Sequence, residues 1–492
     1  MQNKFHGITE DDLNYFKLLL SEKFVFTDTN KLSECSADHT EDFCYTPEVV
    51  LQPATVAEVS NILKHCNQRL IPVTPRGAGT GLSGGALPVF GGVVLDMKRF
   101  DKILNLDVQN FQITTEPGVI TQLLQEHVLE YGLMYPPDPS SKGSCFIGGN
   151  VSENAGGPRA VKYGVVKDYV LNLEVVLPTG EVIWTGANVL KNATGYNLTN
   201  LVVGSEGTLG VITKIVLRLL PAVKHDVLLL VPFRSAEQAS EAVNKIFLSG
   251  HTPSALEFMD REAIALAISY VQDSPIQLKD DIQAHLLIEL DGNDPNQLYS
   301  EADSLTKVLS GFDVGDILFA DSNEQKRMLW NLRRKIGEAV KSRSAYKEED
   351  TVVPRANLPS LLTQIRQIAR EFGFSCVCYG HAGDGNLHVN ILKNKLTDYE
   401  WNEKLPLAIE RLFCEVIKLG GTISGEHGIG FSQKNYIHIA ISEVSLNLMR
   451  SIKLCFDPNN ILNPGKIFPD APELKNIINT FPTTNPIHII NN

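Results

Sequence analysis

The 492-residue sequence lacks several features that would each point to a class of protein. Its eight cysteines are scattered and form neither a C-x-x-C pair nor a C-x-x-C-x-x-C run, so no disulfide framework and no iron–sulfur centre is expected. No apolar run is long enough to span a bilayer, and the N-terminus lacks the apolar core of a signal peptide. We therefore expect a cytoplasmic protein with no transmembrane segment, which could lie at the inner membrane through a partner protein.

Excess positive charge is also missing. Lys and Arg number 44 against 57 Asp and Glu, which gives a formal net charge of -13. A nucleic acid or an anionic membrane surface is therefore not expected as the main partner.

The chain is too long for one ordinary core, so several domains of mixed helix and strand are expected. We predict an N-terminal helical segment (1–42), a domain of strands and glycine loops (43–222), an α+β domain (223–425) and a C-terminal segment (426–492). Helices are expected at 8–24, 235–250, 324–342 and 407–419. Strands are expected at 93–97, 173–184 with a turn at 177–181, 211–220, 226–233 and 284–292.

Residues 75–85, PRGAGTGLSGG, contain a match to G-x-G-x-x-G, the pattern of Rossmann dinucleotide sites. Such a site needs a helix directly after the glycines and a long crossover to a parallel strand. Only eight residues separate Gly84 from Val93, and three glycines and a proline among them exclude a helix. Asp96 is then an ordinary acid at a strand end. A nest of backbone N–H groups that holds an anion is the better interpretation.

Two further glycine-dense segments, 136–164 and 191–215, follow in the same predicted domain. Three such segments predict a long ligand held mostly by backbone, and a cofactor with a pyrophosphate fits this better than a single phosphate.

The octad that runs from His381 to His388 is the second chemical signal. Its central Gly-Asp-Gly favours a turn, which can bring the two imidazoles together. Imidazoles suit zinc and other first-row divalent metals. The third ligand can come from the loop 424–430, which offers both Glu426 and His427.

Seven motifs occur in order between about residues 47 and 467: PRGAGTGLSGG, PPDPSS, IGGNVSENAGG, GSEGTLGVIT, GHAGDGNLH, SGEHGIG and FDPNNILNPGKI. Together they resemble those of the FAD-linked D-2-hydroxy-acid dehydrogenases, which include D-lactate dehydrogenases, glycolate oxidase catalytic subunits and D-2-hydroxyglutarate dehydrogenases. The resemblance implies an α+β fold. Its parts are a two-part FAD-binding domain of the vanillyl-alcohol-oxidase/p-cresol-methylhydroxylase type, an α+β substrate (cap) domain, and a C-terminal helical segment that closes the active site and packs on the FAD domain.

The resemblance also implies the residues that contact FAD. They are Pro75, Arg76, Gly77, Ala78, Gly79, Thr80, Gly81, Leu82, Pro137, Asp138, Ser141, Gly148, Gly149, Asn150, Ser152, Ala155, Gly156, Gly157 and Ile212. Because the phosphate loop contains no His or Cys, we expect FAD without a covalent tether, and Cys145 is not expected to form one. Arg76 is expected to shape the loop.

For the chemistry, the resemblance implies His381, His388 and Glu426 as ligands of a divalent metal, zinc by ligand type. His427 would be the base, and Arg333 would bind the carboxylate of a 2-hydroxy acid. Asn390, just after the histidine pair, matches a position that contacts substrate. Arg334 and Lys335 are expected on a solvated helix face.

Departures from the family pattern bear on substrate size. D-2-hydroxyglutarate enzymes carry a lysine that grips a second carboxylate, and Lys347 is the candidate here, but its spacing to Asp350 is one residue too long. Without a gap the position holds Glu348, and an expected threonine is Gly337. These changes favour D-lactate or glycolate over D-2-hydroxyglutarate.

Three other matters stay open at this point. A metal-dependent hydrolase or metal-binding structural protein, and an alkyl-transferring enzyme of the same flavin fold, are the alternative functions. The electron acceptor is an electron-transfer flavoprotein, a quinone-linked subunit or an iron–sulfur protein, with oxygen a further option. A homodimer is neither predicted nor excluded.

Overall fold

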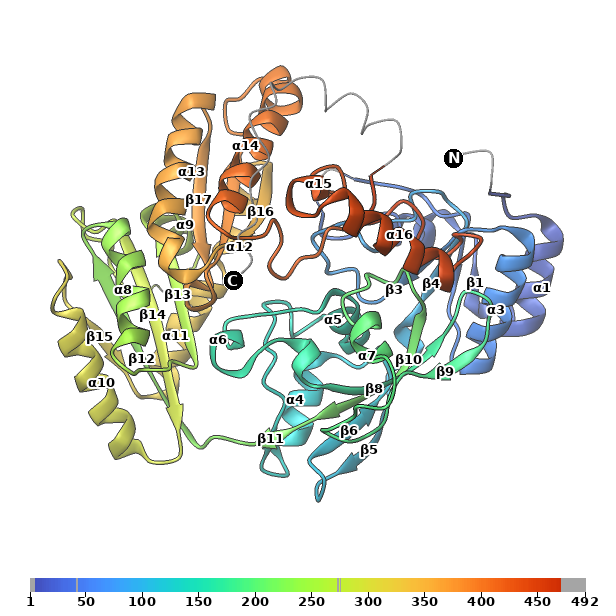
Figure 1. The fold of residues 1–492 in the computed structure, drawn as a ribbon, viewed down its shortest axis with the longest axis horizontal. Helices are drawn as coiled ribbons and strands as arrows, with labels where there is room; N and C mark the ends of the chain where they lie inside the picture. Colours follow the sequence, from blue (N-terminus) through green and yellow to red (C-terminus); the bar gives the residue numbers. More distant parts are fainter. Residues whose placement is uncertain (1–4, 41–42, 272–273, 275, 470–492) are drawn as a thin grey trace.

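The computed structural model describes residues 5–40, 43–271, 274 and 276–469. Its strands lie in four sheets. In Figure 1 the seven-stranded sheet and its helices form one lobe, and the other sheets form a second lobe beside it. No helix in the described part of the chain is long and apolar enough to cross a membrane.

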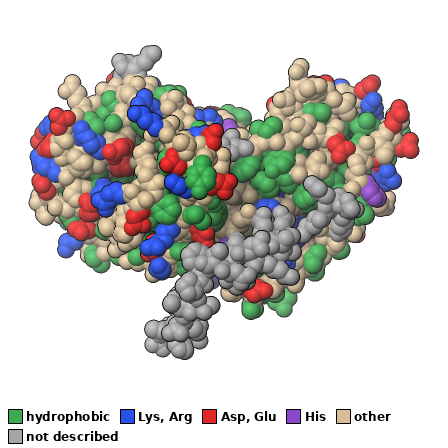
Figure 2. Space-filling model, turned by 90° about the horizontal axis from the view of Figure 1, so that it is seen from above, with side chains coloured by type: hydrophobic (Ala, Val, Ile, Leu, Met, Phe, Trp, Pro, Cys, Tyr) green, Lys and Arg blue, Asp and Glu red, His purple; other side chains and the backbone are tan. Residues whose placement is uncertain are grey.

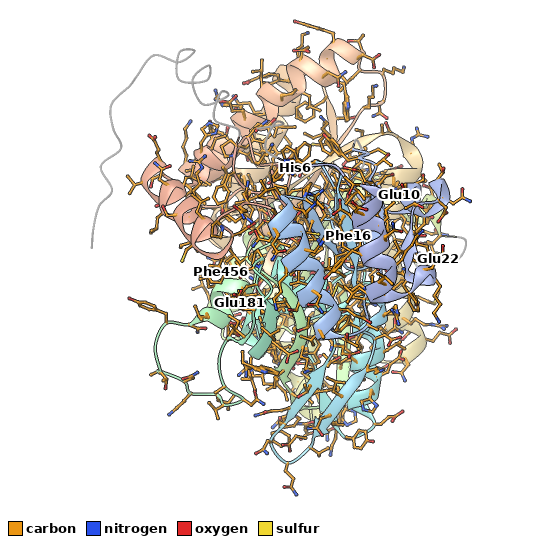
Figure 3. The ribbon with its side chains drawn as sticks, turned by 90° about the vertical axis from the view of Figure 1, so that its right-hand side faces the viewer. His6, Glu10, Phe16, Glu22, Glu181 and Phe456 are labelled. Atoms are coloured by element: carbon orange, nitrogen blue, oxygen red, sulfur yellow. The ribbon has the colours of Figure 1, made fainter. Side chains whose placement is uncertain are left out.

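The first sheet, in the order β1-β2-β4-β3, is mainly parallel, with β4 between β2 and β3. Phe16, labelled in Figure 3, is fully buried where α1 packs against α3. The elements of this unit are α1 (Glu10–Leu20), β1 (Val25–Phe26), α2 (Thr29–Glu34), β2 (Val49–Leu51), α3 (Val56–Arg69), β3 (Val73–Arg76) and β4 (Val93–Asp96).

The second sheet is antiparallel, in the order β5-β6-β10-β8-β9. Its strands are β5 (Ile103–Asp107), β6 (Gln112–Thr115), β8 (Val170–Val176), β9 (Val182–Trp184) and β10 (Val211–Arg218). Around it lie α4 (Thr121–Leu129), β7 (Leu133–Met134), α5 (Ile147–Glu153), α6 (Ala160–Tyr163), α7 (Leu198–Val202) and β11 (Leu220–Pro221).

The third large sheet is antiparallel throughout, in the order β15-β12-β14-β13-β17-β18-β16. Its strands are β12 (His225–Phe233), β13 (Ala255–Asp260), β14 (Ala284–Gly292), β15 (Leu318–Ala320), β16 (Tyr346–Val352), β17 (Ser375–Gly380) and β18 (Asn386–Leu392). One face packs on α8 (Ala236–Leu248), α10 (Pro295–Leu309), α13 (Leu358–Phe372) and α14 (Leu405–Lys418). The other face packs on α9 (Arg261–Tyr270), α11 (Asn323–Arg334) and α12 (Ile336–Arg343). Because side chains alternate along a strand, both faces of this sheet contribute residues to a core.

The chain returns to the second lobe at its C-terminal end. After α15 (Ile437–Ala440) and α16 (Glu443–Phe456), Leu462 pairs with Val73 in parallel, and both are fully buried. Between α14 and α15 the chain reaches the glycine loop after β3, where the N–H groups of residues 431 and 432 donate to Ser83 O, and α15 then packs against α14. The loop 424–430 lies on this path.

Most predicted elements are confirmed, with two corrections. The hairpin joins β8 and β9 as expected, and Ser235 caps α8. The single helix predicted over 324–342 is wrong: the backbone breaks at Lys335 into α11 and α12. The predicted N-terminal helix is shorter, because Ser21 adopts a φ of 64° and ends α1.

The connection after the glycine motif contains no helix, as the sequence predicts. The strands on either side of it, β3 and β4, are nevertheless parallel neighbours, joined by loop alone. Asp96 at the end of β4 is buried and accepts a hydrogen bond from Gln52 Nε2 at 2.7 Å, so it has a structural partner.

Candidate active site

A cavity of about 600 Å³ lies where the two lobes meet. Figure 2 shows the surface hollowed between the lobes. The cavity walls come from the glycine loop after β3, the loops around α5, the start of β10, the helices α11 and α12, and the loop 424–430.

The glycine loop offers this cavity a row of backbone donors. Residues 77–82 line the cavity, and none of their backbone N–H groups donates to another described residue. A Cβ on Gly81 or Gly149 would meet nothing within 4 Å, so the backbone there opens onto empty space. Free N–H groups in such a loop bind anions, and bare backbone lets a ligand come close. These residues fit the pyrophosphate of FAD.

The Arg76 side chain lies against this loop, and its expected role in shaping the loop stays a prediction. Its Nη2 donates to Ala37 O at 2.8 Å, and a Cβ on Gly79 would lie 2.3 Å from the same nitrogen. Gly79 has a φ of 72°, so both the space and the backbone conformation require glycine there.

The structure brings most of the predicted FAD contacts to the cavity. Pro137, Asp138 and Gly157 do not line it. Asp138 instead pairs with Lys142 at 2.7 Å and with Arg334 at 3.0 Å. A Cβ on Gly157 would lie 2.4 Å from Asp138 O, so this glycine serves close backbone packing. The remaining predicted residues all line the cavity wall, and their contact with FAD stays a prediction.

The predicted metal ligands converge. His381 Nε2 lies 3.3 Å from Glu426 Oε1, and His388 Nε2 lies 3.6 Å from the same oxygen. The turn that returns the chain to β18 contains Gly385 at a φ of 79°, where a Cβ would lie 1.9 Å from Val353 O. The Gly-Asp-Gly turn therefore lets both imidazoles meet one carboxylate, and the set of two imidazoles and a carboxylate fits a divalent metal such as zinc.

Buried carboxylates fix the ligand-bearing segments. Glu257 on β13 accepts from His381 Nδ1 at 2.8 Å. Asp350 Oδ2 accepts from the backbone N–H groups of Glu426 and His427 at 2.8 and 2.9 Å, which holds the loop 424–430 against β16. Glu206 accepts from the N–H groups of residues 429 and 430. The loop is thus anchored from both lobes.

His427 lies beside the ligand set. Its ring stacks on His388 at 5.2 Å between centroids, and its Nε2 lies 3.9 Å from Glu426 Oε1 and from Glu348 Oε1. Glu348 also lies 3.2 Å from His388 Nδ1, so Glu348, His388 and His427 form a second possible ligand group. A neutral imidazole has one lone pair, so His388 can serve only one of the two groups.

The groups in this cluster control one another's protonation. Burial alone would raise the pKa of the Glu426 carboxyl, but His381, His388 and His427 lower it to about 2. Burial would likewise lower the pKa of His381, yet Glu257 and Glu426 hold it well above its usual range. Such a site needs positive charge, and a divalent cation would supply it in place of imidazolium protons.

Arg333 is buried at the end of α11 and lines the cavity. Its Nη2 lies 2.6 Å from Glu257 Oε2, and its guanidinium lies over the Tyr379 ring. Its Nε–H is buried and has no acceptor among the described residues. The guanidinium of Arg333 is therefore held in place with a donor left to bind an anion in the cavity.

Two predicted placements need correction. Lys347 does not line the cavity. It alternates with Glu348 along β16 and so lies on the opposite face of the sheet, where its Nζ is 5.4 Å from the Trp401 ring centroid.

Arg334, predicted on a solvated face, lines the cavity and pairs with Asp138. Lys335 pairs with Glu338 on the surface, as expected. Asn390 is buried, two residues beyond His388 and on the same face of β18, without lining the cavity.

Sequence reasoning missed Glu257, the anchoring role of Asp350, and Glu206. For Glu257 the available signal was an acid in the middle of the strand ALEFMD, between apolar residues. Burying such an acid is costly unless it is paired, so it marks a polar site.

Comparison with known proteins shows the family of the chain. Residues 222–467 match the family described as FAD linked oxidases, C-terminal domain, and residues 47–186 match the one described as FAD binding domain. The chain is 37% identical to D-lactate dehydrogenase of Anaerostipes hadrus, over 94% of this chain and 98% of that protein. It is 37% identical to glycolate oxidase subunit GlcD of Bacillus subtilis, over 88% and 91%. It is 36% identical to a probable D-2-hydroxyglutarate dehydrogenase of Oryza sativa subsp. japonica, over 94% and 83%.

The chain therefore belongs to the FAD-linked oxidoreductase family. Within it, the protein is an oxidoreductase of the D-lactate, glycolate or D-2-hydroxyglutarate dehydrogenase type.

Solved structures show the same fold at low identity. P-cresol methylhydroxylase with substrate bound aligns with a TM-score of 0.76 at 20% identity, covering 96% of this chain and 99% of that one. Alkyldihydroxyacetonephosphate synthase aligns with a TM-score of 0.72 at 18% identity, covering 94% and 87%. These likenesses confirm the predicted α+β fold with an FAD-binding domain of the p-cresol-methylhydroxylase type.

Proposed function

We propose that this protein oxidises a small D-2-hydroxy acid, D-lactate or glycolate, to the 2-oxo acid, with untethered FAD and a divalent metal, zinc by its ligand set. The observation that carries the proposal is one shared cavity. Arg333, His388, Glu426 and His427 line the same cavity as the glycine loop, and His381 completes the ligand set behind them.

Residues 77–82 would hold FAD, which would supply the acceptor for the hydride of the substrate carbon that bears the hydroxyl group. A metal held by His381, His388 and Glu426 would polarise the substrate oxygens as a Lewis acid and lower the pKa of the hydroxyl.

The protein's own residues orient the substrate and move its proton. Arg333 binds the carboxylate through the N–H groups that Glu257 does not use, since a guanidinium suits a carboxylate. His427 accepts the hydroxyl proton at Nε2, the ring nitrogen beside Glu426. Because these groups are largely buried, water competes little for them.

D-2-hydroxyglutarate is the second candidate substrate, and specific residues bear on it. Arg334 and Lys341 line the cavity and would offer cations to a second carboxylate. Glu348 lines it too and would repel one, while Lys347 lies on the other face of β16. We therefore favour a monocarboxylate.

The electrons must leave the flavin for a separate acceptor, because the sequence contains no C-x-x-C-x-x-C iron–sulfur run. An electron-transfer flavoprotein, a quinone-linked subunit or an iron–sulfur protein would each serve.

The test is a flavin spectrum followed by a substrate panel. We expect purified protein to carry or take up FAD, and to reduce an artificial dye with D-lactate or glycolate faster than with L-lactate or D-2-hydroxyglutarate. A colourless protein that fails to take up FAD would refute the proposal, and zinc-dependent ester hydrolysis by it would support the hydrolase alternative.

A further inference from the structure

Glu257 contacts both halves of the candidate active site. One carboxylate oxygen lies 2.8 Å from His381 Nδ1, and the other lies 2.6 Å from Arg333 Nη2. The side chain is fully buried on β13, an element separate from those that carry His381 and Arg333. It therefore ties the end of β17 to the end of α11.

The contact with His381 decides which nitrogen can bind a metal. A carboxylate that accepts from Nδ1 keeps the proton there and leaves the lone pair on Nε2. Nε2 is the atom that lies 3.3 Å from Glu426 Oε1. Carboxylates in this position orient metal-binding imidazoles and make them more basic.

The contact with Arg333 decides how the guanidinium faces the cavity. Glu257 holds Nη2, and the Tyr379 ring lies under the guanidinium plane at 4.9 Å. Of the remaining donors, Nε–H has no acceptor among the described residues. A guanidinium fixed at one end and on one face has little freedom left, which lowers the entropic cost of binding a carboxylate.

We propose that Glu257 is a positioning residue that orients the metal-binding imidazole of His381 and the anion-binding guanidinium of Arg333 at the same time. The inference rests on the proposed function. It predicts that loss of this one carboxylate weakens two separable binding events, metal and substrate anion, without any contact to either ligand.

Glu289 offers a matched control on the neighbouring strand β14. It is also a buried carboxylate, with an arginine partner, Arg159 at 3.2 Å, and an N–H donor, Trp330 Nε1 at 2.9 Å. It contacts neither His381 nor Arg333. Loss of either carboxylate should cost stability, but only loss of Glu257 should change ligand binding.

The experiment compares Glu257→Gln with Glu289→Gln in FAD-loaded protein freed of metal. Zinc affinity is measured by chelator competition. Oxamate, a monocarboxylate isostere of a 2-oxo acid, is titrated against the flavin absorbance without metal. In Glu257→Gln we expect zinc to bind about 10–100-fold more weakly, the range for orienting carboxylates, and oxamate about tenfold more weakly. In Glu289→Gln both affinities should stay within about twofold.

Glu257→Asp keeps the negative charge but has a side chain one methylene shorter. It replaces Glu257→Gln in the experiment if circular dichroism shows that the glutamine variant does not fold. Intermediate losses of both affinities would support the proposal. Unchanged zinc and oxamate affinities in either folded variant would overturn it, and so would equal losses in Glu289→Gln. Wild-type protein that binds FAD but neither zinc nor oxamate would instead refute the proposed function.

Discussion

The two sides of the cavity present different kinds of groups to their proposed ligands. On the FAD side, residues 77–82 present backbone N–H groups and glycines that leave space. On the side of the proposed metal ligands, imidazoles and carboxylates from β13, β16, β18, the turn before β18 and the loop 424–430 meet at side-chain distances of 2.8–3.9 Å. A backbone site is damaged by added atoms, whereas a side-chain site is damaged by their removal.

The largest effect should come from removing a metal ligand. His388→Ala should lower turnover by about 10³-fold, because a Lewis acid contributes several kcal/mol to such a reaction. The measurement is dye reduction with D-lactate beside zinc content. The control is His251→Ala: the His251 imidazole pairs with Glu301 in the lobe of the seven-stranded sheet. Full turnover in His388→Ala would refute the metal assignment.

Arg333→Lys should have the next largest effect. It keeps the charge but loses the fixed planar fork, so kcat/KM should fall by about tenfold to a hundredfold, corresponding to about 1.5–3 kcal/mol. Steady-state kinetics should show most of the change in KM. Lys335→Met removes a surface cation close by in the chain and should change neither constant. An equal effect in both variants would contradict a specific role for Arg333.

The FAD side should respond to one added methyl group. Gly81→Ala places a Cβ in open space, so the fold should tolerate it, while FAD binding weakens on the order of tenfold. The measurement is flavin release followed by fluorescence. Gly311→Ala, in the lobe of the seven-stranded sheet and away from the cavity, is the matched control. Unchanged FAD affinity in Gly81→Ala would show that the cofactor lies elsewhere.

The scaffold behind the glycine side offers a test of stability alone. Asp12 is buried and contacts His65 at 2.7 Å and Arg69 at 3.2 Å while capping α1. Burial would raise the pKa of this carboxyl, but its hydrogen bonds hold it well below its usual range.

Asp12→Asn should therefore lower the free energy of unfolding by about 1–2 kcal/mol at neutral pH. The native carboxylate stabilises the fold above the unfolded-state pKa of 3.8, and this contribution disappears as the pH falls through the depressed pKa. Urea unfolding of both proteins at several pH values should show the gap closing in acid. A gap independent of pH would contradict the assignment.

The smallest effect should come from Lys347→Met. Because Lys347 lies on the face of β16 away from the cavity, kinetics with D-lactate and with D-2-hydroxyglutarate should change by less than about twofold. Glu348→Gln, on the cavity face, is the contrast and should change both. A selective loss of activity with D-2-hydroxyglutarate in Lys347→Met would restore Lys347 as the residue that binds a second carboxylate.

Some features of the fold could be predicted from the sequence and others could not. Eight residues with three glycines and a proline exclude a helix after Gly84 by local physics alone, and the structure agrees. The break at Lys335 was not predicted, although Gly337, the weakest helix former in residues 324–342, lies two residues after it.

The sequence by itself determined which functional groups are present: a helix-free glycine loop, two histidines on either side of a turn, and a Glu-His pair in a second glycine loop. Only the tertiary structure decided which side chains act together. Glu257 reaches His381 because β13 and β17 are antiparallel neighbours, and Asp350 holds the loop 424–430 through backbone N–H groups more than seventy residues away. One step along β16 separates Glu348 in the cavity from Lys347 outside it, because successive side chains of a strand face opposite sides of the sheet.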